Sequence, residues 1–339
     1  MTLHRAAAIV ALGLTVSACG GGGGGAVQTG APTPPAPTPP APPPVTISIT
    51  GPGGASVNGI GSPTFNFSGS PPPVGTVFNL AGPAVRSTSN GVASAGLSTS
   101  DVQATFRGTT TVNGVVYPVF DFNIASLGVT AANVRGDGTE VTLAGGSKAG
   151  MVVATLNYTV LGAWTYTASG GAPVYLGQFA TGSQTPSASL PTSGTATYTG
   201  SGATGGVIGG YFVPGGNNTI AGGTVTGDVS MNVNFATNGV SGQFTNMTAK
   251  PLSGGSVPWN NVNLNGNIMR SSGGSVSGST TTSGAPGGAG ANGFSAGASG
   301  SFASNFFGPA HNEIGGTWTL SEGTPDGGKT AFGTFAGTR

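Results

Sequence analysis

The chain has 339 residues, with nine Lys or Arg against eight Asp or Glu, so it is almost neutral. Charged residues make up only 5% of the sequence, and a neutral chain without basic clusters is a poor candidate for binding nucleic acid. One cysteine and two histidines exclude a His/Cys metal cluster within a single chain.

The first 18 residues (1–18) predict a lipoprotein signal peptide. Arg5 supplies the early positive charge, and residues 6–16 form an apolar stretch of the length of a signal h-region. This stretch is too short to span a bilayer, and polar sequence follows at once. The tetrapeptide VSAC at 16–19 matches a bacterial lipobox, so Cys19 is the predicted lipidation site. The alternative is a plain signal peptide that ends near a cysteine.

Acylation of Cys19 predicts a palmitate-bearing protein anchored in the outer membrane. Lipid on the thiol and on the new amino group gives more than one acyl chain, which suffices for stable anchoring. Gly20 follows the cysteine, as in lipoproteins sorted to the outer membrane. An acylated thiol also leaves no cysteine for a disulfide.

Residues 19–45 predict a tether. An uninterrupted glycine run occupies 20–25, and proline dominates 32–44. The first is expected to be flexible coil and the second semi-rigid polyproline II. The alternative for the proline stretch is a recognition motif for a proline-binding partner.

Residues 46–150 predict a smaller β-rich domain, with strand-like runs at 64–67, 103–112 and 115–122. No stretch after about residue 46 shows helical periodicity. The boundary with the following region is expected near residue 150, and the fold of this part is left open.

Residues 151–339 predict a barrel or a sandwich. Apolar and polar residues alternate over 229–235, 261–268 and 314–320, which sends one set to a core and the other to water. Glycine-rich pieces at 200–206 and 271–298 read as loops. Strands are expected near 152–160, 163–168, 195–199, 207–213, 224–235, 240–248, 261–269, 299–307, 314–320 and 330–336.

Alternation alone does not show which face of the barrel wall contacts water, because a transmembrane barrel is apolar on its outer face. The aromatic residues do not recur as girdles, and the last residues are Thr338 and Arg339 rather than an aromatic residue. A lipid anchor would also be redundant on such a barrel. A water-soluble barrel with an apolar filling is therefore expected.

Four motifs carry a family resemblance: LPTSGTATY at 190–198, FGP at 307–309, EIGGT at 313–317 and FGTFAGTR at 332–339. Together they resemble the barrel domain of transferrin-binding-protein-B-like surface lipoproteins, over roughly 155–339. The resemblance implies an all-β protein with an eight-stranded antiparallel barrel beside a smaller β-rich handle. It also implies delivery by a Slam-type translocon.

The same resemblance implies an outer-membrane surface lipoprotein that binds a ligand or host protein non-covalently. Iron or haem acquisition with a TonB-dependent receptor is the implied setting, and no cofactor or enzymatic activity is expected. Transferrin-binding protein B has two lobes and this chain has room for one, which puts transferrin itself in doubt as the ligand. The alternative is a structural or adhesive cell-surface or matrix lipoprotein. The ligand-binding residues are not identified.

Three short motifs match phosphate-binding, dinucleotide-binding or hydrolase signatures, but the sequence around each does not fit that chemistry. The GxxxxGKT match at 323–330 contains Pro-Asp-Gly and precedes only nine residues, so a hairpin turn is expected. The GxGxxG match at 200–205 lies between two strand-like segments. The GxSxG match around Ser295 would need His311 as its base and a strand-to-helix turn.

Several single residues have two interpretations. His311 is expected near a barrel rim, where an exposed imidazole could ligate haem iron, although a loop histidine without a role is favoured. Glu313 is expected in a structural hydrogen-bond network, and the three tryptophans in core or rim packing. The acidic pairs Asp137 with Glu140 and Glu322 with Asp326 read as turn residues rather than as glycosidase carboxylates.

Overall fold

The computed structural model describes a body made almost entirely of β-strands. The predicted signal peptide, Cys19 and the predicted tether lie outside the described residues. Among the described residues, no helix has the length and apolar character needed to cross a membrane. The described residues are 48–50, 56–58, 72–80, 82–88, 91–98, 100–112, 114–171, 173–201, 205–215, 219–251, 255–283, 293–323 and 328–339.

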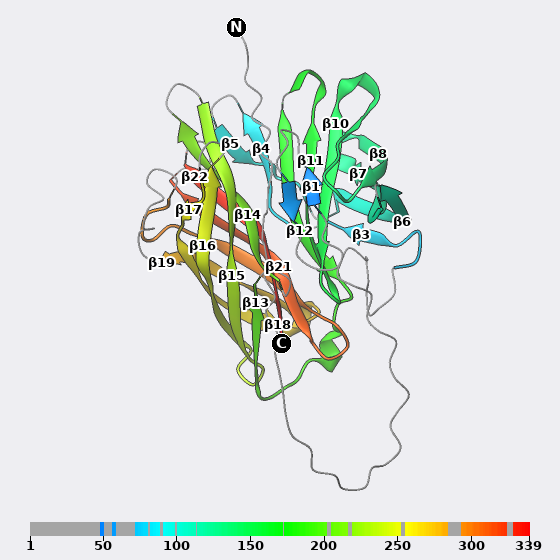
Figure 1. Ribbon diagram of the computed structural model, residues 1–339. Helices are drawn as coiled ribbons and strands as arrows, with labels where there is room; N and C mark the ends of the chain where they lie inside the picture. The colour runs from blue at the N-terminus through cyan, green and yellow to red at the C-terminus, as the bar shows by residue number, and fades with distance from the viewer. Residues whose placement is uncertain are drawn as a thin grey trace, which may run out of the picture.

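The strands are named in chain order, as labelled in Figure 1. They are β1 (Ser48–Thr50), β2 (Ser56–Asn58), β3 (Val77–Asn79), β4 (Ala84–Thr88), β5 (Gly91–Ser94), β6 (Val102–Val112), β7 (Val115–Ile124), β8 (Val129–Arg135), β9 (Val141–Thr142), β10 (Lys148–Thr155), β11 (Thr159–Thr167), β12 (Val174–Gly182), β13 (Thr195–Gly200), β14 (Gly206–Gly215), β15 (Thr219–Asn234), β16 (Gly239–Pro251), β17 (Val257–Pro258), β18 (Asn261–Met269), β19 (Ser275–Ser283), β20 (Ser299–Phe307), β21 (Glu313–Glu322) and β22 (Lys329–Thr338). Short 3-10 turns occupy Ala125–Leu127, Ala144–Gly146, Ser169–Gly171, Ser187–Ser189 and Arg270–Ser272.

The C-terminal strands form a closed antiparallel barrel. The ring runs β14, β15, β16, β18, β19, β20, β21 and β22, and the pairing of β22 with β14 closes it. β14 pairs with the first half of β15 and β13 with the second half, so β13 and β14 act as one strand interrupted after Gly200. The predicted eight-stranded antiparallel barrel is therefore confirmed.

The barrel is filled by aromatic and aliphatic side chains that alternate with outward polar ones. Trp318 is fully buried, and its ring centroid lies 5.7 Å from that of Phe244 and 6.4 Å from that of Trp259. Glycines make room for this ring, because a Cβ on Gly333 would lie 2.6 Å from Trp318 Nε1. The other large core residues are Tyr198, Tyr211, Phe235, Phe294, Phe302, Phe306 and Phe335.

Two further sheets pack face to face and form a sandwich, which we call the handle. One sheet has the order β3-β6-β7-β8 and the other the order β5-β4-β12-β11-β10-β9. Phe122 of the first sheet meets Trp164 of the second, with ring centroids 5.7 Å apart. A Cβ on Gly177 would come within 2.4 Å of the Trp164 ring, so the glycine shapes the space for the tryptophan.

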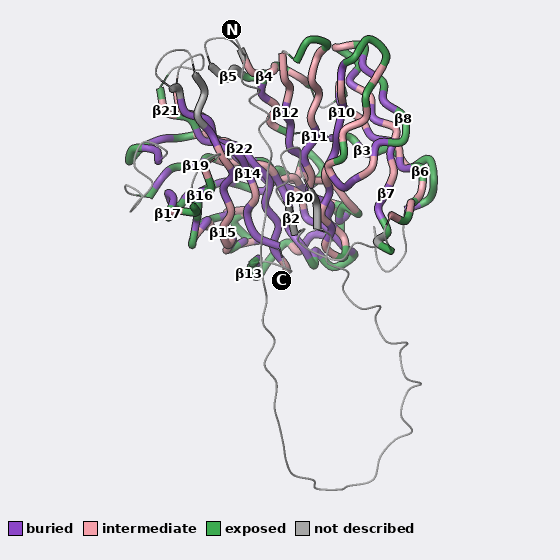
Figure 2. Tube along the Cα trace, turned by 45° about the horizontal axis from the view of Figure 1, so that its top comes forward, coloured by how far each residue is buried: buried purple, intermediate pink, exposed green. Residues whose placement is uncertain are grey.

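The six-stranded sheet is buried on both faces. One face contributes to the handle core, while the other places Ala163 and Leu176 against Phe212 and Phe332 on the outside of the barrel. The handle strands, cyan to green, lie beside the barrel strands, which run from yellow-green to red (Figure 1). In Figure 2 the buried residues continue along β14 and β22, next to β11 and β12.

The pairing of the strands bears on the expected boundary near residue 150. The runs predicted at 152–160 and 163–168 fall in β10 and β11, which belong to the six-stranded handle sheet. The barrel sheet begins at Thr195. Local sequence shows that a segment is a strand but not which sheet it joins, because the partner strands lie elsewhere along the chain.

The predicted loop over 271–298 was wrong in part, because it contains β19. This strand is built almost wholly from serine, threonine and glycine. Its inward positions are Val276, Thr280 and Thr282. The hydroxyls of the two threonines donate hydrogen bonds to the carbonyl oxygens of Thr319 and Ser295, respectively. Polar inward residues hid the strand from an analysis based on apolar alternation.

Candidate functional site

The family-like motif around Glu313 builds the joint between the handle and the barrel. The Glu313 side chain is 1% exposed, and its two oxygens accept backbone N–H bonds from Asn157 (2.9 Å) and Tyr158 (3.0 Å) in the β10–β11 turn. Burial raises the pKa of this carboxyl, and the hydrogen bonds it accepts act in the opposite direction. The structural role predicted for Glu313 is consistent with these contacts.

The FGP motif forms the second half of the same joint. Gly308 has φ +87°, and a Cβ there would lie 2.8 Å from the Tyr158 ring. Its N–H donates to the Ser183 carbonyl (2.8 Å), and its own carbonyl accepts from the Thr185 hydroxyl (2.5 Å). Only glycine meets both demands, so this motif serves the junction of the two domains.

His311 is buried and hydrogen-bonded, so neither the alternative of an exposed haem ligand at the rim nor the favoured loop histidine without a role describes it. It is 6% exposed, and its Nδ1 lies 2.9 Å from the Tyr198 hydroxyl. That hydroxyl donates to the His311 carbonyl (3.0 Å), and Arg339 Nη1 lies 3.2 Å from Nε2. An Nδ1–H tautomer satisfies all three contacts. Burial first, and then the Arg339 charge, lower the pKa of His311, so the ring is neutral and both of its nitrogens are engaged.

Ser295 and His311 cannot form a catalytic pair. Ser295 precedes β20 and His311 follows it, so the nine-residue strand separates them by about 30 Å. The Ser295 N–H donates to the Glu322 carboxylate (2.7 Å). The segment lies between two antiparallel strands, β19 and β20, and the strand-to-helix turn of a hydrolase is not formed.

The phosphate-loop match lies in a β-hairpin, as predicted. β21 and β22 pair antiparallel, with Glu322 opposite Lys329. Lys329 Nζ donates to the Gly293 carbonyl (2.6 Å) and lies 3.9 Å from the Glu322 carboxylate. The GxGxxG match likewise interrupts a strand, between β13 and β14.

The remaining acidic candidates are ion-paired in the handle. Asp137 lies 2.9 Å from Arg135, and Glu140 lies 3.8 Å from Lys148. Asp326 is outside the described residues. Within the part of the chain that the structure describes, no group of three or more His, Cys, Asp and Glu side chains could hold a metal ion.

The outer face of the barrel carries rows of uncharged polar side chains that run across the strands. Each row is set by the strand register, which places outward residues of neighbouring strands side by side. The central row is Thr197, Asn232, Ser241, Asn265, Ser279 and Ser301. The row on one side is Thr199, Ser230, Gln243, Asn263, Thr281, Ser299 and Ser321. The row on the other side is Thr195, Asn234, Gly239, Asn267, Ser277 and Ala303.

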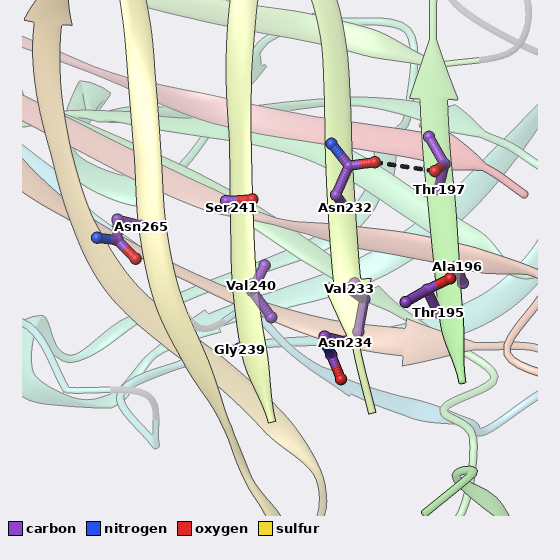
Figure 3. A pocket seen from close by; sticks show the side chains of 10 residues that line it. All are labelled: Thr195, Ala196, Thr197, Asn232, Val233, Asn234, Gly239, Val240, Ser241 and Asn265. Atoms are coloured by element: carbon purple, nitrogen blue, oxygen red, sulfur yellow. Dashed lines mark hydrogen bonds between the residues drawn. The ribbon is translucent and has the colours of Figure 1, made fainter. Parts of the chain in front are cut away.

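This face is hollowed where β13, β15, β16 and β18 meet. The hollow has a volume of about 430 Å³, and we call it the amide groove. Figure 3 shows its side chains in order across the strands, with the hydrogen bond between Thr197 and Asn232 (2.9 Å) dashed. Gly239 has no side chain to fill the hollow. The lining residues are Thr195, Ala196, Thr197, Asn232, Val233, Asn234, Gly239, Val240, Ser241 and Asn265.

The sequence contained part of the signal for the amide groove. The alternating asparagines of 261–267 predict an outward amide face on one strand. The residues opposite Asn265, which are Ser241 on one side and Ser279 on the other, follow only from the register of strands distant in sequence. The groove was therefore missed.

A filled antiparallel barrel joined to a β-sandwich defines this chain as an all-β protein of barrel-and-handle type. Residues 190–339 match the family model described as the C-lobe and N-lobe β-barrels of Tf-binding protein B. The C-terminal region therefore matches the barrels of transferrin-binding protein B, and the resemblance carried by the motifs is confirmed. The match begins just before β13, where the barrel sheet also begins.

Similar solved structures include the transferrin-binding protein B double mutant Tyr-167-Ala and Trp-176-Ala of Haemophilus parasuis Hp5, at 15% identity and a TM-score of 0.38, covering 70% of this chain and 42% of that one. Intact Ap-TbpB with its N and C lobes has 16% identity and a TM-score of 0.37, covering 70% and 54%. The protein of serogroup B Neisseria meningitidis has 16% identity and a TM-score of 0.35, covering 70% and 51%. The chain spans about half the length of these proteins, and no curated protein sequence matches it.

Proposed function

We propose that this chain is an outer-membrane surface lipoprotein that binds a ligand or a host protein non-covalently. The observation that carries the proposal is the family of the barrel, since residues 190–339 match the barrels of a protein that binds transferrin. The described residues form one barrel with one handle, so we propose a partner other than transferrin. The outer surface of the barrel and the handle would do the binding, because the barrel interior is filled.

The domain division belongs to the same proposal. A signal peptide occupies 1–18, a lipid on Cys19 and the tether at 19–45 hold the body near the membrane, and the barrel starts near residue 190. The handle then extends from about residue 46 across the expected boundary at 150, up to β12. The sheet pairing supports this division, because β10, β11 and β12 join the handle.

We also propose that the protein is not an enzyme. The groups that sequence motifs offered for catalysis hold the fold together instead: His311 bonds Tyr198, and Glu313 bonds the β10–β11 turn. Because these side chains are engaged in structural hydrogen bonds, they support a binding role rather than a catalytic one. A setting in iron or haem acquisition, with a TonB-dependent receptor and a Slam-type translocon, remains part of the proposal, but His311 as a haem ligand does not.

The experiment starts from the full chain extracted from membranes in mild detergent. Radiolabelled palmitate is expected to enter the wild type and not a Cys19→Ser variant, and surface protease is expected to cleave the protein on intact cells. Immobilised protein is then exposed to host serum, and captured material is examined by mass spectrometry and by haem absorbance. Failure to incorporate palmitate, together with no captured partner, would refute the proposal.

A structural or adhesive role is the second candidate, and the uncharged rows on the barrel favour it. Surfaces without net charge repel one another little, so copies could associate. Light scattering at rising protein concentration separates the two roles. A binder stays monomeric over the range, whereas a matrix protein grows in size.

A further inference from the structure

We propose that the amide groove is a binding site for neutral carbohydrate, that is, for the hydroxyl groups of an uncharged glycan. The inference rests on the proposed binding function and names the chemistry of one partner. It is argued from the hydrogen-bonding groups that line the groove and from the absence of charged and aromatic side chains among its described lining residues.

The lining offers hydrogen-bonding groups that both donate and accept. A carboxamide presents two N–H donors beside a carbonyl acceptor, and each serine or threonine hydroxyl does both. A sugar hydroxyl has the same dual character, so each lining group can pair with it in either direction. Asn232, Ser241 and Asn265 present these groups side by side on three neighbouring strands, about 4.8 Å apart.

The central groups of the groove are open to a ligand. Ser241 and Asn265 are exposed, and their side chains have no hydrogen-bond partner among the described residues. Asn234 differs, because its Oδ1 accepts the N–H groups of Ala236 and Thr237 and so shapes the turn at the rim. The binding groups stand on strands rather than on loops, which keeps their spacing rigid.

The lining lacks charge, which decides against ionic partners. Among its described residues there is no Lys, Arg, Asp or Glu. A phosphate, sulfate or carboxylate would leave water without gaining a counter-ion, and burying an unpaired charge is costly. Nucleic acids, sulfated glycans and the propionates of haem are therefore poor fits.

The lining also lacks the anchors of protein and lipid interfaces. Hot spots between proteins are built from Trp, Tyr and Arg, none of which lines the groove. Its apolar members, Ala196, Val233 and Val240, are 6%, 1% and 3% exposed, because their side chains face the barrel core. An acyl chain or a haem face would find no apolar wall, whereas a polyhydroxyl chain needs none.

The polar rows extend beyond the groove, which suits a chain of sugars better than a single one. The central row continues through Ser279 to Ser301, whose hydroxyl bonds that of Thr319. No aromatic ring lines the groove for a sugar face to stack on. We therefore expect weak binding of one sugar and stronger binding of longer or clustered glycans, through multivalency.

The test uses the full chain in detergent and named probes. Maltohexaose, mannohexaose and cellohexaose are the neutral probes, and 6′-sialyllactose and a heparin hexasaccharide are the charged ones. Titration by isothermal calorimetry or ligand-observed NMR is expected to detect at least one neutral hexasaccharide and neither charged probe. Asialofetuin, before and after enzymatic removal of its glycans, separates a glycoprotein source from a free polysaccharide.

Variants then locate the site. Asn265→Ala with Ser241→Ala is expected to weaken binding of the neutral probe about tenfold or more, because each lost hydrogen bond is worth a severalfold change. Asn261→Ala is the matched control, since Asn261 is also an exposed residue of β18 on the same face, about 13 Å from Asn265. Asn265→Asp keeps the shape and adds a charge, and provides a second test if the double variant folds poorly.

The outcomes separate this inference from the proposed function. Binding of charged probes only, no binding of any neutral probe, or an equal loss in Asn261→Ala and the double variant would overturn the carbohydrate site. A host protein captured from serum, together with no binding of any neutral probe, would overturn the site and leave the binding function standing. Absence of any bound probe and of any captured partner would contradict both.

Discussion

The handle and the barrel are both built from antiparallel β-strands, but they differ in the side chains that their exposed faces present to water. The handle sheets place opposite charges face to face, as in Arg107 with Asp121 at 2.6 Å across β6 and β7. The rows on the barrel face carry only hydroxyls, amides and small residues. Glu313, Lys329 and Arg339 of the barrel lie at strand ends or at the joint, whereas Asp228 lies within β15 and accepts a hydrogen bond from Asn246 Nδ2 (2.7 Å). The difference shows that a sheet face can be hydrated without charge, which leaves it open to neutral partners.

The two cores also differ. The handle core is a flat layer between two sheets, in which Phe122 meets Trp164. The barrel core is enclosed on all sides by one closed sheet, with Trp318 near the centre of its aromatic cluster. A closed sheet has less freedom to collapse around a lost side chain, so we expect truncations to cost more in the barrel.

The largest expected effect is therefore that of Trp318→Ala. Removing a fully buried tryptophan lowers the free energy of unfolding by about 3–5 kcal/mol, measured by urea unfolding with circular dichroism. Trp164→Ala in the handle is the matched variant and is expected to cost less within this range. A larger loss for Trp164→Ala would reverse the comparison of the two cores.

Gly308→Ala tests the joint between the two regions. A positive φ and a Cβ 2.8 Å from the Tyr158 ring together predict a loss of about 2–3 kcal/mol. Gly297→Ala is the control, since it has φ +97° but nothing within 4 Å of its Cβ, and about 1 kcal/mol is expected. Equal losses at both positions would mean that the contact with Tyr158 contributes nothing.

Glu313→Gln is expected to change the pH dependence of stability. Because burial raises the pKa of this carboxyl, the folded state holds its proton more tightly than the unfolded state. Its contribution is fully present below the unfolded pKa and is lost as the pH rises through the folded pKa. The variant, which also loses a buried hydrogen bond worth about 1–2 kcal/mol, is expected to show a flatter profile on the acidic side. An unchanged slope in chemical unfolding at several pH values would contradict this.

His311→Gln is expected to change the pH dependence of stability in the opposite direction to Glu313→Gln. Burial and Arg339 lower the pKa of His311, so the unfolded state takes up the proton first. The stability contribution is present above the unfolded pKa and is lost as the pH falls through the folded pKa. The variant is expected to lose about 1 kcal/mol at neutral pH, from its bond to Tyr198, and to lose less of its stability on acidification than the wild type. Thermal melts from pH 7.5 to pH 5 measure both effects.

The smallest effect is expected at the surface pair of the handle. Arg107→Met removes a half-exposed ion pair and lowers stability by about 0.2–1 kcal/mol at low salt, less at high salt. Asn232→Ala on the barrel is the comparison and is expected to show no salt dependence, because the groove has no charge to screen. A salt-dependent loss in Asn232→Ala would contradict the neutral character assigned to this face.

Local sequence patterns were sufficient to predict those elements that depend only on residues adjacent in the chain. The alternation over 229–235 predicted the second half of β15, and Pro-Asp-Gly predicted the hairpin between β21 and β22. The motifs from 190 to 339 predicted the eight-stranded barrel, which the strand pairing confirms. These inferences held because strand alternation and turn chemistry act over a few residues.

Contacts between distant segments decided the rest. Only the assembled sheets show that β10 and β11 belong to the handle, that Glu313 holds Asn157 and Tyr158, and that His311 is buried beneath Arg339. The amide groove likewise exists only where Asn232, Ser241 and Asn265 are aligned by strand register. The sequence alone determined that strands form and which side chains alternate. The tertiary structure decided which strands pair, because pairing depends on packing between segments that are far apart along the chain.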